Sequence, residues 1–213
     1  MNIKQINDDN TGVRGTLPGY SATDALHFAD RLHISYLPLA VTLAESFPNA
    51  KKWLELGSGA GSFMCHLRAK RDDIIGVTLD GCPAVKESSP FIDPEKHFVV
   101  RTDVPYHLVD DDNNTVLFDM IVSFEHFEHI QDEHFEVFLQ NIRKHCHKDT
   151  IIIATAANWG DGQRHCNVKQ HKEWIDYLTS MGWVMLEETY VTQQNTPFNF
   201  NVSQSAQLTF KPS

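Results

Sequence analysis

The sequence predicts an α/β protein in which a mostly parallel sheet carries helices on both faces. Short apolar segments alternate with amphipathic ones along the 213 residues, a pattern that implies right-handed crossovers between parallel strands. The glycine-rich turn GSGAG, residues 57–61, follows an apolar segment directly, as expected where a strand leads into a helix. A hydrophobic content of 41% suits one domain with a sizeable core.

The N-terminal part of the chain is expected to contribute helices rather than strands. Residues 1–19 are polar and show little periodicity, so we expect a flexible arm there, and residues 20–213 form the single domain. Residues 22–47 show helical periodicity that is interrupted near Pro38, which predicts two short helices.

The remaining elements follow in regular alternation. Strands are predicted at 53–56, 74–79, 97–100, 117–124 and 150–157, and helices at 62–70, 132–148 and 172–182. Two alternating segments, 184–192 and 202–210, are expected to form an antiparallel pair that closes the sheet. Three prolines within 81–97 exclude a long helix there, and residues 105–115 are expected to be a loop.

Amino-acid composition limits the kinds of partner and the cellular compartment that we expect for this protein. A net charge of -10 argues against a broad basic face, so a nucleic-acid partner is disfavoured. Four scattered cysteines without CxxC spacing are typical of reduced thiols in a cytoplasmic protein. The chain shows neither a signal peptide nor an apolar run of membrane-spanning length. We therefore expect a cytoplasmic protein without a membrane partner, and the oligomeric state is left open.

The glycine turn carries the most specific ligand-binding signal. Its glycines let backbone N–H groups approach a ligand closely. A dinucleotide site wants G-x-G-x-x-G, whereas Gly57, Gly59 and Gly61 run G-x-G-x-G, with Glu55 two residues before the first. That carboxylate would repel a pyrophosphate, so the turn predicts a different ligand.

This pattern resembles the first motif of the Rossmann-like (class I) S-adenosylmethionine-dependent methyltransferases, and the resemblance spans residues 20–211. It implies a Rossmann-like sheet of seven strands, mostly parallel, with an antiparallel closing strand. Asp80 ends the second strand, where the family binds the ribose hydroxyls, and Asp103 follows the third, where the family contacts the adenine amino group. The implied cofactor-binding residues are Glu55, Gly57, Ser58, Gly59, Gly61, Asp80, Asp103, Val104 and Phe124. The chain departs from the family in 81–97 and in 105–115, where a loop replaces the usual helix.

The stretch FEHFEHI, residues 124–130, leaves the fourth strand at the same edge of the sheet. If a helical turn begins there, Glu125, Glu128 and His129 lie at i, i+3 and i+4 and share one face, whereas His126 points elsewhere. Acids in a first helical turn can simply be favoured by the macrodipole. The same three side chains can instead ligate a divalent cation.

The spacing E-x-x-E-H also resembles small-RNA 2′-O-methyltransferases and, more distantly, quinone-precursor O-methyltransferases. This resemblance implies a metal site of Glu125, Glu128, His129 and His165, with Mg²⁺, Mn²⁺ or Zn²⁺ as the ion. Without a metal, His165 is the expected catalytic base, since imidazole is available near neutral pH, and Glu125 is the alternative. A solvent-exposed His165 without any role is the third possibility.

The function expected is methyl transfer from S-adenosylmethionine to an O or N atom of a small-molecule acceptor. One alternative is a metal-dependent O-methyltransferase that acts on hydroxyls of a quinone precursor or an RNA 3′ end. Another is a regulatory protein that binds the cofactor without catalysis. Tyr20 is expected to close over the cofactor. The N-terminal segment, residues 157–171 and residues 193–201 are expected to hold the acceptor.

Overall fold

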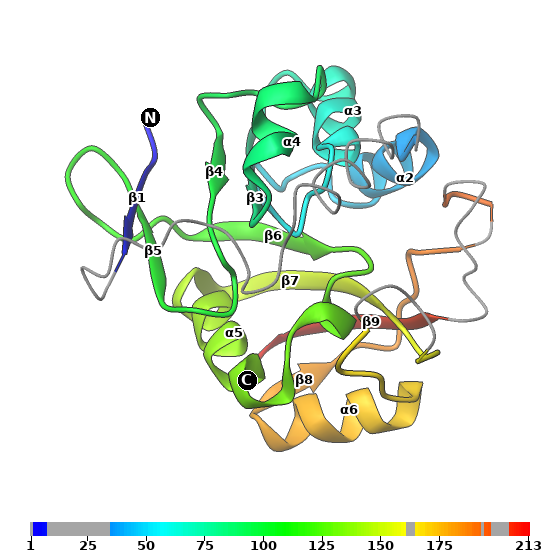
Figure 1. The fold of residues 1–213 in the computed structure, drawn as a ribbon. Helices are drawn as coiled ribbons and strands as arrows, with labels where there is room; N and C mark the ends of the chain where they lie inside the picture. Colours follow the sequence, from blue (N-terminus) through cyan, green and yellow to red (C-terminus); the bar gives the residue numbers. More distant parts are fainter. Residues whose placement is uncertain (1, 8–34, 161–164, 193, 197–204) are drawn as a thin grey trace.

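The computed structural model describes residues 2–7, 35–160, 165–192, 194–196 and 205–213. One sheet has the strand order β4-β3-β2-β6-β7-β9-β8 (Figure 1). Its strands are β2 (Lys52–Leu56), β3 (Ile75–Asp80), β4 (His97–Val99), β6 (Phe118–Ser123), β7 (Cys146–Ala157), β8 (Trp183–Met185) and β9 (Ser205–Pro212). β9 runs antiparallel to both of its neighbours, β7 and β8, and the other neighbouring strands pair in parallel. The predicted mostly parallel sheet with an antiparallel closing strand is confirmed.

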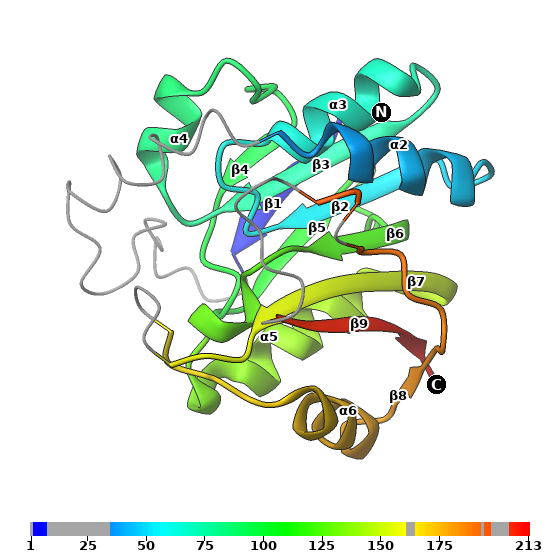
Figure 2. The ribbon, with the colours of Figure 1, turned by 90° about the vertical axis from the view of Figure 1, so that its right-hand side faces the viewer.

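Helices cover both faces of this sheet, as predicted. They are α2 (Leu37–Ser46), α3 (Ser62–Lys70), α4 (Pro83–Ser88), α5 (Asp132–Lys144) and α6 (His171–Ser180). Successive residues of a strand point to opposite faces. Leu54 therefore joins the core that α5 and α6 cover, whereas Trp53 joins the core beneath α2 and α3. Figure 2 shows α2 and α3 lying together beside β2 and β3.

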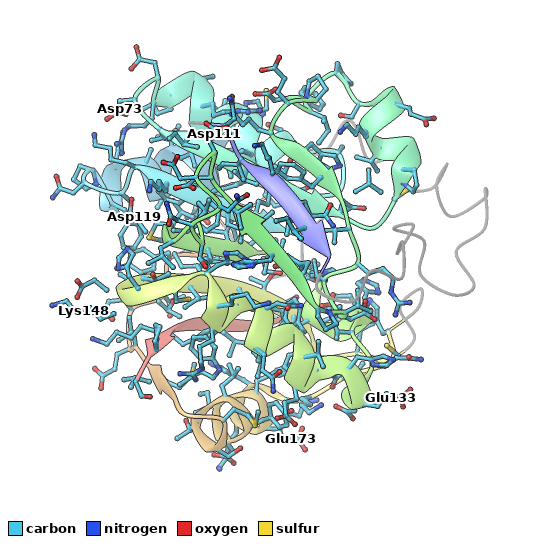
Figure 3. All side chains as sticks on the ribbon, turned by 90° about the vertical axis from the view of Figure 1, so that its left-hand side faces the viewer. Asp73, Asp111, Asp119, Glu133, Lys148 and Glu173 are labelled. Carbon is cyan, nitrogen blue, oxygen red and sulfur yellow. The ribbon has the colours of Figure 1, made fainter. Side chains whose placement is uncertain are left out.

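A two-stranded ribbon replaces the loop expected at 105–115. Residues Tyr106–Val109 form β5, which pairs antiparallel with β1, Lys4–Asn7. The side chains of Ile3, Tyr106 and Leu108 are buried in the core on the α5 side of the sheet, and Figure 3 shows the ribbon beside α5. The ribbon buries apolar surface on the face that a helix usually covers.

The same ribbon corrects the prediction of a flexible N-terminal arm. That prediction is wrong for residues 4–7, because β1 is paired along its length. The backbone amide of Asn2 also donates a 3.2 Å hydrogen bond to Asp111, which is labelled in Figure 3. Residues 8–34, with Tyr20 and the first predicted helix, lie outside the described residues.

Several element boundaries differ from the predicted ones for local reasons. The second predicted N-terminal helix is α2, which begins at Leu37 with Pro38 in its first turn, where proline is tolerated. The three prolines of 81–97 leave only the six residues of α4. The predicted antiparallel pair exists as β8 and β9, but β8 ends at Met185. No helix among the described residues has the length and apolar character of a membrane span.

Candidate active site

The glycine turn between β2 and α3 has a backbone that only glycine adopts without strain. The φ angles of Gly57, Gly59 and Gly61 are 62°, 49° and 77°, in the left-handed region. A Cβ on Gly57 would lie 2.4 Å from the ring of His126. No described atom lies within 4 Å of a Cβ built on Gly59. The His126 ring therefore packs against the turn at Gly57, whereas the space beside Gly59 is free of described protein atoms.

Asp80 at the end of β3 holds this turn in place. Its Oδ2 accepts a 2.8 Å hydrogen bond from the amide of Gly59, and its Oδ1 accepts one of 2.8 Å from Cys82. Burial raises the pKa of Asp80 to about 6, and the two amide donors oppose that rise. The carboxylate is thus mostly ionised at neutral pH and can accept further hydrogen bonds.

Glu55, on β2, is buried from solvent. Burial raises the pKa of this carboxyl to about 8, the amide of Met64 opposes the rise, and the charge of Asp80 adds to it. Glu55 is therefore mostly protonated at neutral pH. Ser58, the next predicted residue, donates its backbone amide to Leu79 at 3.0 Å, and its side chain is buried.

The segment after β4 carries Asp103 in a bidentate ion pair. Nε and Nη2 of Arg101 donate to its two carboxylate oxygens at 2.9 and 2.6 Å. Val104, the next predicted residue, has its carbonyl bonded at 2.8 Å by the side-chain amide of Asn141. The glycine turn, Asp80 and Asp103 thus follow the neighbouring strands β2, β3 and β4, where ligands bind in open α/β sheets. Cofactor contacts by these residues stay a prediction.

Phe124 and two unpredicted contacts complete the surroundings of the turn. Phe124 stacks on the ring of Tyr36, with centroids 5.7 Å apart. Ser89 donates its hydroxyl to the carbonyl of Ala60 at 2.6 Å, and Ile92 would contact a Cβ on Gly61 at 2.5 Å. The segment after α4 therefore packs against the glycine turn, a long-range contact that the sequence did not reveal.

His126, Thr102 and Asn141 are further residues that the sequence did not assign to the site. His126 is half-buried, its Nε2 is 2.9 Å from the Thr102 hydroxyl, and desolvation lowers its pKa to about 3. Asn141 is buried on α5, three residues after Phe138. A polar residue on the apolar face of a predicted helix is the one signal that could have indicated it.

The chain leaves β6 by a sharp turn at Glu125, not by a helix. Glu125 has φ 51°, and its amide donates to the carbonyl and hydroxyl oxygens of Thr155 at 3.1 and 3.0 Å. The 3₁₀ helix η2 spans Phe127–His129. The predicted helical face of Glu125, Glu128 and His129 is therefore wrong for Glu125, because a left-handed residue interrupts any helix there.

Glu128, His129 and His165 do come together. One donor atom from each lies within 4.8 Å of the other two, and Glu125 is outside this group. The Nε2 atoms of both histidines are 4.0 Å from Oε1 of the buried Glu128. The backbone carbonyl of Glu128 accepts hydrogen bonds from Cys166 and Asn167 at 2.9 and 3.0 Å, so backbone contacts fix His165 against η2.

The tautomer of His165 follows from its hydrogen bond. Its Nδ1 is 2.8 Å from the carbonyl oxygen of Trp159, which can only accept, so Nδ1 carries the proton. In the neutral ring, Nε2 then carries the lone pair and faces Glu128. His165 can use this atom to accept a proton or to ligate a metal ion.

Comparison with protein families identifies the family of the chain. The model of a methyltransferase domain family matches residues 27–204, well over half of the chain. The chain belongs to this methyltransferase family. No curated protein sequence gives a significant match.

Solved structures share the fold of this methyltransferase. A TehB-like SAM-dependent methyltransferase from Corynebacterium glutamicum superposes with a TM-score of 0.67 at 18% identity, over 91% of this chain and all of that one. The N-methyltransferase NodS from Bradyrhizobium japonicum, complexed with S-adenosyl-L-homocysteine, gives 0.60 at 14% identity over 89% and 97%. An O-methyltransferase family protein from Burkholderia thailandensis gives 0.64 at 10% identity over 91% of this chain but only 61% of its own length. This chain spans less than two thirds of that relative.

Proposed function

We propose that this methyltransferase transfers a methyl group from S-adenosylmethionine to an O or N atom of a small-molecule acceptor. The observation that carries the proposal is the meeting of the open glycine turn, Asp80 and Asp103 at three neighbouring strand ends. Its structural relatives include both O- and N-methyltransferases by their names, and NodS is complexed with the demethylated product of this donor.

The residues of the site fit such a cofactor. Gly59 leaves room for close approach of a ligand to the backbone. The ionised Asp80 is suited to accept hydrogen bonds from a pair of ribose hydroxyls, and Asp103 to accept one from the adenine amino group. S-Adenosylmethionine would supply a methyl group activated on a sulfonium. The acceptor atom would bond to this methyl carbon in line as the carbon–sulfur bond breaks, and S-adenosylhomocysteine would be the leaving thioether.

On the acceptor side, His165 would act as the base. The Trp159 carbonyl fixes the protonated Nδ1 of His165, so Nε2 is available to take a proton from an acceptor hydroxyl. Glu125 is the alternative base at the end of β6. Residues 161–164 and 197–201, expected to help hold the acceptor, lie outside the described residues.

A methyl-transfer assay tests this proposal directly. Purified protein is incubated with S-adenosylmethionine labelled in the methyl group and a panel of phenols, catechols, carboxylates and primary amines. We expect labelled product with at least one class, and a loss of about 100-fold in rate for His165→Gln, since general-base catalysis typically contributes 10²–10⁴-fold. Wild-type rates with His165→Gln would remove His165 as the base.

The cluster of Glu128, His129 and His165 favours a second candidate function, a metal-dependent O-methyltransferase. Its donors are one carboxylate oxygen and two imidazole nitrogens, a set that suits Mn²⁺, Fe²⁺ or Zn²⁺ better than Mg²⁺. The bond from Nδ1 of His165 to a backbone carbonyl is the arrangement that usually orients a metal-binding histidine. In this case the ion would polarise an acceptor hydroxyl, and Nε2 of His165 would be a ligand.

Glu128→Gln separates the two candidates, because it removes a ligand but not the base. Mn²⁺ and Zn²⁺ are titrated into wild type, Glu128→Gln and the exposed control Glu133→Gln. If the cluster binds metal, we expect wild type and the control to bind and Glu128→Gln to lose at least tenfold in affinity. Equal and negligible heats in all three proteins would leave His165 as a base only.

A further inference from the structure

The segment that carries Asp103 has no helix of its own to support it. Residues 100–117, all of them described, contain β5 and turns but no helix. Loops without regular structure are usually more mobile than the elements that they join. The carboxylate of Asp103 nevertheless sits in a defined position, so other elements must hold this segment.

Asn141 on α5 holds the backbone on both sides of Asp103. Its Nδ2 donates to the carbonyl of Thr102 at 2.9 Å and to the carbonyl of Val104 at 2.8 Å. Its Oδ1 is 3.4 Å from the amide of Tyr106, at the start of β5. One buried side-chain amide thus bonds the backbone at three positions between residues 102 and 106.

His126 connects the same segment to the glycine turn. Its Nε2 is 2.9 Å from the hydroxyl of Thr102, and its ring lies where a Cβ on Gly57 would be. The ring also packs edge-on against Phe138, with centroids 5.7 Å apart. A single side chain therefore contacts the segment after β4, the turn after β2 and helix α5.

We propose that Asn141 and His126 are positioning residues of the cofactor site, which fix the backbone around Asp103 and thereby set the selectivity for an adenine amino group. Arg101 orients the carboxylate itself through its two hydrogen bonds. Asn141 and His126 hold the chain from which this carboxylate projects. The inference rests on the proposed function, in which Asp103 receives the adenine amino group.

If these side chains only stabilise the fold, their loss should affect ligand binding differently. Loss of a buried hydrogen bond would then lower stability and affect all ligands of the site equally. A positioning role predicts loss of preference between two ligands that differ only in the amino group. This preference is the ratio of dissociation constants for S-adenosylhomocysteine and its purine analogue without the amino group.

The experiment is calorimetric titration of both ligands into wild type and matched variants of the full chain. Asn141→Ala removes the side-chain hydrogen bonds to the backbone around Asp103. Gln140→Ala is its control, because Gln140 is exposed on the same helix and bonds Glu136. Thr102→Val removes the bond to His126 with little change of shape, and His126→Phe removes it from the other side while keeping a ring against Gly57. Asp103→Asn sets the baseline without the acceptor carboxylate. Thermal melting of every variant checks that it is folded.

We expect wild type and Gln140→Ala to prefer S-adenosylhomocysteine by about tenfold or more, as for one hydrogen bond to a charged group. Asn141→Ala should approach the preference of Asp103→Asn, and Thr102→Val and His126→Phe should lower it several-fold. If Asn141→Ala does not fold, the preferences of Thr102→Val and His126→Phe decide the outcome. Unchanged preference in the folded variants overturns the inference, as does a wild type that binds both ligands equally. A wild type that binds neither ligand contradicts the proposed function itself.

Discussion

The amide of Gly59 donates a 2.8 Å hydrogen bond to Oδ2 of Asp80. This bond joins the glycine turn after β2 to the end of β3, 21 residues later in the chain. It explains why an acid is useful at this strand end even before a ligand arrives, since the carboxylate holds the turn in a conformation that exposes Gly59. The same carboxylate then has lone pairs left for a ligand.

Cofactor binding should therefore depend on pH through Asp80. Burial raises the pKa of Asp80 to about 6. In the proposed function ribose hydroxyls would donate to its ionised form, so affinity should rise as pH increases through 6 and level off above 7. Below pH 6, we expect the dissociation constant of S-adenosylhomocysteine to rise by up to about tenfold per pH unit. Calorimetry between pH 5 and 8 measures this. A flat profile in wild type, equal to that of Asp80→Asn, would contradict the assignment.

Glu55 should lower the stability of the protein as pH rises. Its pKa is about 8 when folded, against 4.5 ordinarily, so the folded state binds more protons between these values and loses stability as pH increases through that window. Glu55→Gln has no ionisable group at this position and should not show this pH dependence. From pH 5 to pH 8 we expect wild type to lose on the order of 3 kcal/mol relative to the variant. Urea unfolding at both values tests this, with Glu45→Gln as an exposed control, and parallel pH dependences would refute it.

Gly57→Ala should be costly, because the position combines a positive φ with close contact. A methyl group there would meet the His126 ring at 2.4 Å, and φ is 62°. We expect a loss of roughly 2–4 kcal/mol in the free energy of unfolding. Gly160→Ala is the matched control, since no described atom lies within 4 Å of its Cβ position. Equal stabilities of the two variants would contradict the geometry.

Comparing Glu125→Gly with Glu125→Ala separates the backbone strain at this residue from any catalytic role of its carboxylate. Glycine adopts φ 51° freely, whereas glutamate does not, so we expect a gain of about 1 kcal/mol in unfolding free energy relative to Glu125→Ala. Both variants lack the carboxylate. If Glu125 is the base, both should lose about 100-fold in methyl-transfer rate. Full activity in both would leave Glu125 as a turn residue.

The sheet and the strand-end acids were predictable because their signals are local. The turn at Gly57 to Gly61 is encoded by glycine spacing, and Asp80 and Asp103 follow apolar segments directly. The β1–β5 ribbon was missed because it depends on pairing between Lys4 and Val109, far apart in sequence. The sequence of a polar N-terminal segment does not indicate which strand it pairs with.

The candidate site was only partly predictable for the same reason. Glu128, His129 and His165 were predicted together, and the structure does bring them together. Glu125 was assigned to the same face because a regular helix was assumed, and its left-handed φ is invisible in the residue type. The roles of His126 and Asn141 depend on contacts between three separate elements.

The most direct test is titration of S-adenosylhomocysteine into wild type, Asp80→Asn and the exposed control Asp176→Asn at pH 7.5. We expect wild type and Asp176→Asn to bind with equal, micromolar affinity, and Asp80→Asn to bind at least about tenfold more weakly, since hydrogen bonds to a charged carboxylate are lost. Absence of binding to wild type, or an Asp80→Asn variant that binds as wild type does, would contradict the cofactor site described for this methyltransferase.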